Sequence, residues 1–534
     1  MPGRVEERMT SYERGPALEL LEVTIGEQLR RTAARFPDGD ALVSRHQNRR
    51  FTWAGLDASV DEWAEGLLGM DLQPGDRVGC WATNCFEWVL LQLGCARAGL
   101  VLVNVNPAYR AYELGFVVKK SRMKALFLWR RDVRTNFQAI FEESGAQTRA
   151  VYFDDHVWTA RVPVTHVADR NDAVNIQYTS GTTGSPKGVL LTHRNILNNG
   201  FVGGRQMLVT EADRINVAVP LYHCFGCVMA VMVALVHGAA MVLPNATFDG
   251  EATLAATAAE RCTVLYGVPT MFIAQLEHPN FVSYDLSSLR TGIMAGAPCP
   301  IELMKRVVAQ MHCRDLTIGY GQTEASPLIT MSGVEDPLEV RVSTVGAALP
   351  ETEVKILDPV SGATVERGVQ GELCSRGYLI MLGYDGEEDA TRRAVDAEGW
   401  LHTGDLAVMR EDGNCKITGR ARDLIIRGGE NIYPREIEEF LFTHAAIADA
   451  QVFGVPDLKY GEAVAAWIRL RAPLTEEELL VWCKSSIAHY KVPKYVTFVE
   501  QYPMTVTGKI QKFKMREEEI RARRLEEAAR IETA

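Results

Sequence analysis

Residues 178–188 read YTSGTTGSPKG, with the apolar strand patterns VNIQ directly before them and VLLT directly after. Glycines and small hydroxyl residues let several backbone N–H groups converge on phosphate oxygens, and the hydroxyls and Lys187 add donors and a positive charge. The order is not that of a Walker A loop, because Pro186 precedes the lysine and Gly188 follows it. The segment therefore predicts a phosphate-binding loop between two strands.

The chain around this loop has the pattern of an α/β protein. Residues 24–36 have apolar side chains at helical spacing after a threonine that can cap the helix, 76–82 form a short apolar strand, and 86–100 form a buried helix. Helices that alternate with short apolar strands predict a mostly parallel sheet covered on both faces. From about residue 354, short strands of alternating polarity with tight turns predict a small β-barrel-like subdomain.

A third pattern begins after Gly419, where helices and strands predict a compact α+β unit of about 110 residues. A chain of 534 residues is too long for one ordinary domain. We therefore expect an N-terminal domain at 1–420 and a C-terminal domain at 421–534. The charged segment 514–534 is expected to be a solvated helix.

Composition excludes several classes of protein. A net charge of −11 disfavours a dedicated nucleic-acid binder, and the 11 scattered cysteines are typical of reduced thiols. The N-terminal residues MPGRVEERMTSYERG are charged and lack an apolar core, so no secretory signal is expected. The apolar stretch 217–244 is interrupted by proline, histidine and glycine, which disfavours an integral membrane segment. We expect a cytoplasmic protein.

With this loop, the chain resembles the adenylate-forming superfamily, which includes acyl- and aryl-CoA synthetases, firefly luciferase and the adenylation domains of nonribosomal peptide synthetases. The family signature (S/T)SGTTGxPKG is matched throughout. Further motifs occur in family order over nearly the whole chain: YGQTE at 320–324, TGD at 403–405, IIRGGENIYPREIEE at 425–439 and PMTVTGK at 503–509. The resemblance implies a large N-terminal domain and a small mobile C-terminal domain.

The resemblance also implies a nucleotide site. The residues that it assigns to ATP or AMP are Thr179, Ser180, Gly181, Thr182, Thr183, Gly184, Lys187, Gly296, Ala297, Pro298, Tyr320, Gly321, Gln322, Thr323, Asp405 and Arg420. The ring of Tyr320 can cover an adenine face, and a carboxylate such as Asp405 can accept hydrogen bonds from ribose hydroxyls. Glu324, with Thr179, is expected to hold Mg²⁺, a hard cation that prefers oxygen ligands.

The resemblance makes Lys509 the catalytic lysine, with His223, Thr323 and Glu324 as further catalytic residues. Lys509 would neutralise charge between the acid and the α-phosphate. Arg422 occupies the hinge position, where the family commonly has Asp or Lys, and Gly428, Gly429 and Glu430 lie on the CoA side. Because two separate segments need the same site, a hinge rotation between the half-reactions is implied.

The expected reaction is that of an AMP-forming acyl-CoA synthetase, with ATP, Mg²⁺ and coenzyme A. The predicted acyl pocket contains His223, Phe225, Gly321 and Pro327, and Gly321 stands where enzymes that resemble acetyl-CoA synthetase have tryptophan. The pocket segments carry no charge partner for an ammonium group, which disfavours an amino acid. The run RGGENIYPREIEEFL at 427–441 most resembles fatty acyl-CoA ligases, and a medium-chain or branched fatty acid is the expected substrate.

Several alternatives stay open at this point. An aryl-CoA ligase and a fatty acyl-AMP ligase that loads a carrier protein fit the same motifs, and a homodimer is an open expectation. His223 has a second interpretation as an ordinary core histidine. A P-loop kinase is disfavoured by the absent Walker pattern, and a silent scaffold by the presence of Lys509, Glu324 and Asp405. The C-x-x-C pair at 224–227 lacks the further ligands of a zinc site.

Overall fold

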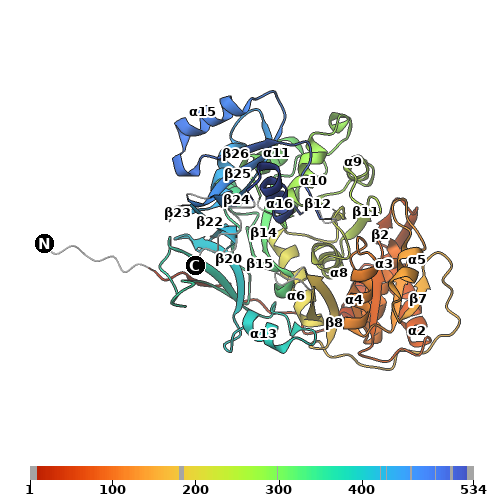
Figure 1. Cartoon of the computed structure of the whole chain (residues 1–534). Helices are drawn as coiled ribbons and strands as arrows, with labels where there is room; N and C mark the ends of the chain where they lie inside the picture. Colours follow the sequence, from red (N-terminus) through yellow and green to blue (C-terminus); the bar gives the residue numbers. More distant parts are fainter. Residues whose placement is uncertain are drawn as a thin grey trace.

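The computed structural model describes residues 9–179, 186–297, 299–420, 423–427, 430–457, 460–487, 489–505 and 509–525. Several residues that the sequence assigns to a site lie outside the described residues: Ser180, Gly181, Thr182, Thr183, Gly184, Pro298, Arg422, Gly428 and Gly429. For Arg420 and Glu430 only the backbone is described. Figure 1 shows the C-terminal elements (blue) on the opposite side of the molecule from β7 and α5 (orange).

The first of two large sheets carries the ends of the predicted phosphate loop. Its strand order is β19-β9-β8-β5-β4-β6-β7. The strands are β4 (Arg77–Trp81), β5 (Val101–Asn104), β6 (Ala125–Leu128), β7 (Arg149–Tyr152), β8 (Ala173–Thr179), β9 (Lys187–Thr192) and β19 (Gly383–Tyr384). Strands β4 to β8 are parallel, as expected, but β9 and β19 add an antiparallel edge. The strands on either side of the predicted phosphate loop therefore pair as a β-hairpin.

The second large sheet is also mixed, with the order β16-β15-β14-β13-β12-β10-β11-β2-β3. Its strands are β2 (Asp40–Ser44), β3 (Arg49–Thr52), β10 (Arg214–Asn216), β11 (Ala240–Leu243), β12 (Val264–Gly267), β13 (Thr291–Ala295), β14 (Asp315–Gly321), β15 (Leu328–Met331) and β16 (Ala347–Ala348). The central strands are parallel, whereas β3, β15 and β16 are antiparallel to their neighbours. The chain reverses between β14 and β15, which is where the YGQTE motif lies.

The helices of this part mostly cover the two sheets, and the sequence predicted the N-terminal cap of one of them. They are α1 (Ile25–Arg35), α2 (Trp53–Leu68), α3 (Phe86–Ala98), α4 (Ala111–Ser121), α5 (Phe137–Ser144), α6 (His193–Gln206), α7 (Cys224–Cys227), α8 (Val231–His237), α9 (Gly250–Glu260), α10 (Pro269–Leu276), α11 (Ile301–Gln310), α12 (Leu338–Ser343) and α13 (Glu388–Ala394). Thr24 caps α1, as predicted, and forms a capping box with Glu27. Helix α3 ends two residues earlier than predicted because Gly99 adopts a left-handed conformation, with φ of 74°.

The apolar stretch 217–244 forms two short helices and a strand. The sequence predicted one helix over 227–236, but the helical segment is divided into α7 and α8. Strand β11 follows in the predicted place. Among the residues that the structure describes, no helix is both long and apolar enough to cross a membrane.

The predicted β-rich subdomain is a five-stranded antiparallel sheet with the order β1-β17-β18-β20-β21. Its strands are β1 (Tyr12–Arg14), β17 (Thr352–Leu357), β18 (Gln370–Gly377), β20 (Leu401–Met409) and β21 (Cys415–Arg420). The sequence did not predict β1, which pairs with β17 across more than three hundred residues of chain. The local sequence of a strand does not show which distant strand it pairs with, so this pairing could not be predicted from either segment alone.

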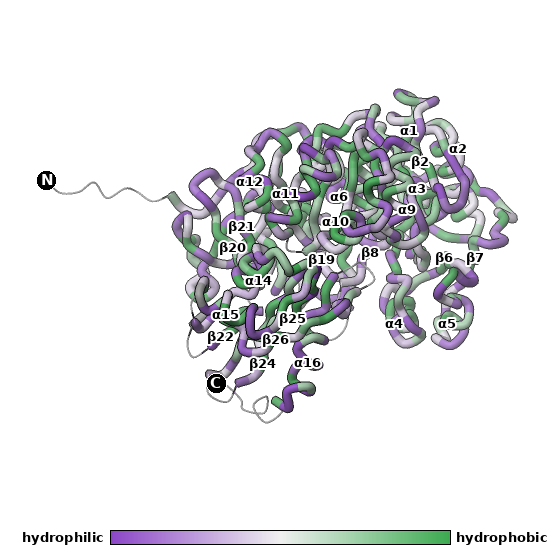
Figure 2. The backbone as a smooth tube through the Cα atoms, turned by 90° about the horizontal axis from the view of Figure 1, so that it is seen from above, coloured by the Kyte–Doolittle hydropathy of each residue, from purple (hydrophilic) through white to green (hydrophobic). Residues whose placement is uncertain are grey.

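The C-terminal part has a sheet and a hydrophobic core of its own. It contains β22 (Ile425–Arg427), β23 (Glu430–Ile432), α14 (Pro434–Phe442), β24 (Ile447–Asp457), β25 (Gly461–Leu470), α15 (Glu476–Ser486), β26 (Tyr495–Phe498) and α16 (Lys512–Arg523). Ile425, Val464 and Leu479 belong to its core, which is distinct from the large core of the N-terminal part. The green segments of β25 in Figure 2 mark this second apolar interior.

Helix α16 differs from the sequence prediction. It was expected to be a solvated helix, yet Met515 and Glu519 are buried against the C-terminal sheet. The indole N–H of Trp467 donates to Glu519 at 2.7 Å, which satisfies a carboxylate that burial would otherwise destabilise. Most residues of α16 are charged, so its sequence does not show the apolar face that an inward-facing helix usually has.

All eleven cysteines lie within the described residues, and each is buried and free of disulfide bonds. Cys227 accepts hydrogen bonds from the amides of Asn104 and Gln177, at 3.4 and 3.3 Å. Cys227 thus contributes to the packing of α7 against β5 and β8. Among the described residues, the group with metal-ligand geometry consists of Glu372, Cys374 and His402, and it includes neither Cys224 nor Cys227.

Candidate active site

Two strand ends fix the predicted phosphate loop. In the β8–β9 hairpin, Thr179 pairs with Lys187, so that both ends of the loop are held in register. Thr179 and Lys187 are each half-buried. The loop between them lies outside the described residues, but the paired strands determine where it begins and ends. Its flanking hydroxyl and ammonium groups lie at one sheet edge, as the sequence predicted.

The YGQTE motif leaves β14 through a tight backbone turn. The register of β14 against β15 shifts between Tyr320 and Gly321, and the backbone N–H of Gln322 donates to the carbonyl of Pro327 at 2.9 Å. A Cβ atom on Gly321 would lie 1.8 Å from that same carbonyl oxygen. A side chain at position 321 therefore requires the segment that contains Pro327 to move, which adds a backbone reason for the glycine to its predicted role in the acyl pocket.

Tyr320 and Asp405 meet, although 85 residues separate them in the chain. The hydroxyl of Tyr320 donates to Oδ2 of Asp405 at 2.7 Å. Asp405 lies on β20 and is largely buried, and its Cα pairs with that of Arg420 on β21. The structure thus brings together three of the residues that the sequence assigned to the nucleotide.

Glu372 supports this part of the site, and sequence reasoning missed it. One carboxylate oxygen accepts from the backbone N–H of Gly404 at 2.9 Å, and the other lies 3.0 Å from Nδ1 of His402. The TGD turn is therefore held from β18. Position 372 carries no local signal of this role, because the partners lie about thirty residues further along the chain.

A second set of contacts gathers at the predicted phosphate side. The hydroxyl of Tyr384 donates to Oε1 of Glu324 at 2.9 Å, and Nζ of Lys187 lies 4.9 Å from the centre of the same ring. Burial and the neighbouring Glu324 carboxylate raise the pKa of Tyr384 well above its usual value, so the hydroxyl stays protonated and donates. The sequence predicted Glu324 and Lys187 as site residues but missed the tyrosine between them.

His223 lies at the start of the short helix α7. Nδ1 of His223 accepts from the backbone N–H of Phe225 at 3.2 Å and so caps the short helix α7. Burial, and next the positive charge of Lys509, lower the pKa of His223 to about 4. The imidazole is thus neutral at neutral pH. Its accepting Nδ1 places the ring proton on Nε2, which can act as a donor.

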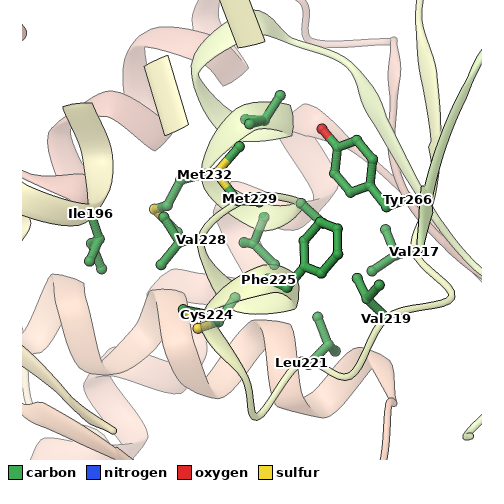
Figure 3. Close-up of a cluster of buried hydrophobic side chains, with 14 of the residues drawn as sticks. Ile196, Val217, Val219, Leu221, Cys224, Phe225, Val228, Met229, Met232 and Tyr266 are labelled. Atoms are coloured by element: carbon green, nitrogen blue, oxygen red, sulfur yellow. The ribbon is translucent and has the colours of Figure 1, made fainter. Parts of the chain in front are cut away.

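The side chains near this histidine are mainly apolar. The Phe225 ring stacks on Tyr266 with ring centres 5.8 Å apart, and Figure 3 shows both in a cluster with Val217, Leu221 and Met229. Sγ of Cys224 lies 3.8 Å from the hydroxyl of Thr323, which joins the α7 turn to the YGQTE motif. This cluster fits a hydrocarbon chain or ring better than a charged group.

Polar contacts of α14 and β25 join the C-terminal part to the N-terminal part. The backbone N–H of Ile301 donates to Glu439 at 3.4 Å, Arg435 donates to the carbonyl of Ile417 at 3.1 Å, and Arg469 lies 3.8 Å from Glu277. In this arrangement the positive charge of Lys509 contributes to the lowered pKa of His223.

Comparisons with known proteins agree with this geometry. The AMP-binding enzyme family matches residues 29–385, and the AMP-binding enzyme C-terminal domain matches 436–509. The "Putative acyl-CoA synthetase YngI" of Bacillus subtilis (strain 168) is 47% identical, covering 94% of this chain and 98% of the relative. The "Medium-chain acyl-CoA ligase ACSF2, mitochondrial" of Homo sapiens is 42% identical, covering 93% and 87%.

Solved structures are similar over almost the same length. ATP-bound MatB from Rhodopseudomonas palustris has a TM-score of 0.82 at 29% identity, covering 92% of this chain and 98% of its own. The anthranilate CoA ligase AuaEII in complex with anthranoyl-AMP has a TM-score of 0.85 at 26% identity, covering 94% and 98%. The likeness therefore includes both the large N-terminal part and the smaller C-terminal part.

Proposed function

The chain belongs to the AMP-binding enzyme family, and from that premise we propose that it is an AMP-forming acyl-CoA synthetase. A carboxylic acid and ATP give acyl-AMP and pyrophosphate, and coenzyme A then displaces AMP to give acyl-CoA. The observation that carries the proposal is the contact of Tyr320 with Asp405, beside the YGQTE turn whose Glu324 contacts Tyr384. Lys509, whose charge helps to lower the pKa of His223, would supply a cation where an acid meets the α-phosphate.

The nucleotide would occupy the space between the two sets of contacts described above. The ring of Tyr320 would cover the adenine, with backbone at Gly296, Ala297 and Pro298 along its edge, and Asp405 would hold the ribose. The hydrogen bond from Tyr320 orients that carboxylate before the nucleotide arrives. Lys187 and the loop at 179–188 would hold the β- and γ-phosphates, as backbone N–H groups do in anion-binding turns.

The residues at the phosphate side fit Mg²⁺. Glu324 supplies a half-buried carboxylate whose Oε1 accepts one hydrogen bond, and a carboxylate has further lone pairs for a cation. The hydroxyl of Thr179 adds a second oxygen at the end of β8. When bound, Mg²⁺ would neutralise charge on the phosphate oxygens. We propose Glu324 and Thr179 as its protein ligands.

In the first half-reaction, a carboxylate oxygen of the acid forms a bond to the α-phosphorus as the bond to pyrophosphate breaks. Lys509 would neutralise the charge that accumulates between these groups. His223, which is neutral and donates from Nε2, would orient the carboxylate without adding a second positive charge. Thr323 would contact the phosphate from the adjacent turn.

The second half-reaction would require the C-terminal part to move. We propose that residues 1–420 and 421–534 are separate domains that rotate about Arg422, so that Gly428, Gly429 and Glu430 replace Lys509 at the site. The separate hydrophobic cores support rotation as rigid bodies. The thiol of coenzyme A would then attack the carbonyl carbon of the acyl-AMP and release AMP.

A medium-chain or branched fatty acid is the proposed substrate. The support is the apolar cluster around Phe225 and the relatives named medium-chain acyl-CoA ligase. An aryl acid is the second candidate, favoured by the structural likeness to an anthranilate CoA ligase. A carrier protein as acceptor, a homodimer and a cytoplasmic location stay predictions.

The test is ATP–pyrophosphate exchange with a panel of acetate, straight medium-chain acids, branched acids and benzoates, followed by addition of coenzyme A or a holo-carrier protein. Medium-chain acids are expected to exceed acetate by roughly 10-fold or more in kcat/KM, because each added methylene contributes to binding in an apolar pocket. Faster exchange with benzoates would favour the aryl alternative. If no acid yields AMP, the proposed function is wrong.

A further inference from the structure

Tyr384 contacts two charged residues of the predicted phosphate side, Glu324 and Lys187, and it lies outside the motifs at 178–188 and 320–324. It belongs to the two-residue strand β19, where it pairs with Val189 two positions beyond Lys187. The next residue, Asp385, donates its backbone N–H to the carbonyl of Gly188 at 2.8 Å. The strand that leaves the phosphate loop therefore carries Tyr384 beside it.

The surroundings of β19 hold the tyrosine firmly. Oδ1 of Asp385 lies 2.7 Å from Nη2 of Arg77, and only 6% and 16% of these side chains are exposed. The backbone N–H of Tyr384 itself donates to the hydroxyl of Thr391 at 2.9 Å. A well-buried ion pair and a side-chain hydrogen bond thus fix the backbone on both sides of the ring. Breaking the Asp385–Arg77 pair would leave a buried charge without its partner, which is costly. The pair therefore holds the backbone next to Tyr384 in place.

The phenol ring contacts the two charges through different parts of its surface. Its hydroxyl donates to Glu324 at 2.9 Å, and its π-system faces the ammonium of Lys187 at 4.9 Å. The π-face of an aromatic ring attracts cations, whereas a phenol O–H is a donor suited to a carboxylate. One side chain therefore contacts both a positive and a negative group, and these two groups attract each other.

We propose that Tyr384 is a positioning residue that keeps Glu324 turned toward Mg²⁺ and Lys187 toward the phosphates, and so sets how strongly Mg²⁺ supports ATP binding. The inference rests on the proposed function, since it takes Glu324 as a Mg²⁺ ligand. Without the ring, Lys187 and Glu324 would be able to pair directly and neutralise each other. If only the hydroxyl were removed, the Glu324 carboxylate would lose the hydrogen bond that orients it, but the ring would still lie beside Lys187.

Two variants separate these effects. Tyr384→Phe removes only the hydroxyl, and Tyr384→Leu removes both the hydroxyl and the aromatic face. Tyr378→Phe is the matched control, because the hydroxyl of Tyr378 is buried and has no hydrogen-bond partner within the part of the chain that the structure describes. Glu324→Gln is the positive control for loss of Mg²⁺ binding.

The measurement is calorimetric binding of ATP in the absence of any acid, at a series of free Mg²⁺ concentrations. The readout is the ratio of the Kd for ATP without Mg²⁺ to that with saturating Mg²⁺. Tyr384→Phe is expected to lower this ratio by about 10-fold, as loss of an outer-shell partner of a metal ligand does. Tyr384→Leu should lower it further, and Tyr378→Phe should stay within about twofold of the wild type, since no hydrogen bond is lost. Electron paramagnetic resonance of Mn²⁺ in the presence of ATP gives an independent measure of cation binding.

The outcomes distinguish this inference from the proposed function. If Tyr384→Phe keeps the wild-type ratio while the wild type binds ATP with Mg²⁺, the role of Tyr384 is refuted and the enzyme class stands. If the wild type binds no ATP, both are refuted. Thermal melting of each variant controls for folding, and the Phe variant, which loses a single oxygen atom, decides the question if the Leu variant unfolds.

Discussion

At the scale of single residues, the site depends on pairs that are distant in sequence. Asp405 receives a hydrogen bond from Tyr320, Glu324 receives one from Tyr384, and His223 experiences the charge of Lys509. In each pair one partner orients the other or sets its charge state. The orientation and charge state of these groups are thus set before substrate binds. The free energy needed to reorganise them in the transition state of the proposed reaction would be lower for that reason.

Lys509→Ala tests the most distant of these pairs. The variant is expected to lose adenylation by at least about 100-fold, because charge between the acid and the α-phosphate would no longer be neutralised. Thioester formation from supplied acyl-AMP should be largely retained. ATP–pyrophosphate exchange and product analysis from acyl-AMP plus coenzyme A measure the two half-reactions. Lys514→Ala, on exposed helix surface, is the control, and equal loss of both half-reactions in Lys509→Ala would contradict the assignment.

At the scale of elements, two helix starts depend on neutral histidines. His223 caps α7, and Nδ1 of His193, the first residue of α6, accepts from the backbone N–H of Ile25 at the start of α1, at 3.3 Å. Burial lowers the pKa of each ring to about 4. Protonation at Nδ1 would remove the acceptor and leave a buried N–H group without its partner.

These two histidines predict acid sensitivity. An unfolded histidine binds its proton near pH 6.5, whereas the folded rings resist protonation until about pH 4. The unfolded state therefore binds more protons in this range, and stability should fall as the pH is lowered from about 6.5 to 4. In His193→Asn the side-chain oxygen can still accept from Ile25 but does not titrate, so Tm should fall less steeply with pH. An unchanged slope in thermal melts at pH 7, 6, 5 and 4.5 would refute this account.

At the scale of the whole molecule, the C-terminal part contacts the N-terminal part through polar groups of α14 and β25. It has its own sheet and core, so its fold does not depend on how it is docked. Under the proposed function, this docked arrangement would present Lys509 to the site for adenylation. The proposed rotation requires that neither of two positions be strongly preferred.

Arg435→Ala tests this docking. Arg435 donates to the carbonyl of Ile417 at 3.1 Å and lies 3.7 Å from Glu439 on the same helix. Loss of this hydrogen bond should disfavour the arrangement that places Lys509 and reduce adenylation by up to about 10-fold. Thioester formation should change little or rise. The two half-reactions, measured separately, check the prediction, and a loss confined to thioester formation would show that the docked arrangement serves the other step.

The sequence by itself determined the local features of this protein. The strands on either side of the loop at 178–188, the cap at Thr24 and the change of pattern near 354 could be predicted, because each depends on the conformation or chemistry of neighbouring residues. The family motifs also proposed Glu324, Asp405 and Lys509 as site residues, and their roles stay predictions.

Only the tertiary structure decided which of these residues meet, and what supports them. The pairing of β1 with β17, the buried face of α16 and the contacts of Glu372 and Tyr384 all arise between segments distant in sequence. Register across a sheet and packing between helices are set by the combined burial of many side chains, and no single segment carries that information. For the same reason, Tyr384 was indistinguishable in the sequence from any other half-buried tyrosine.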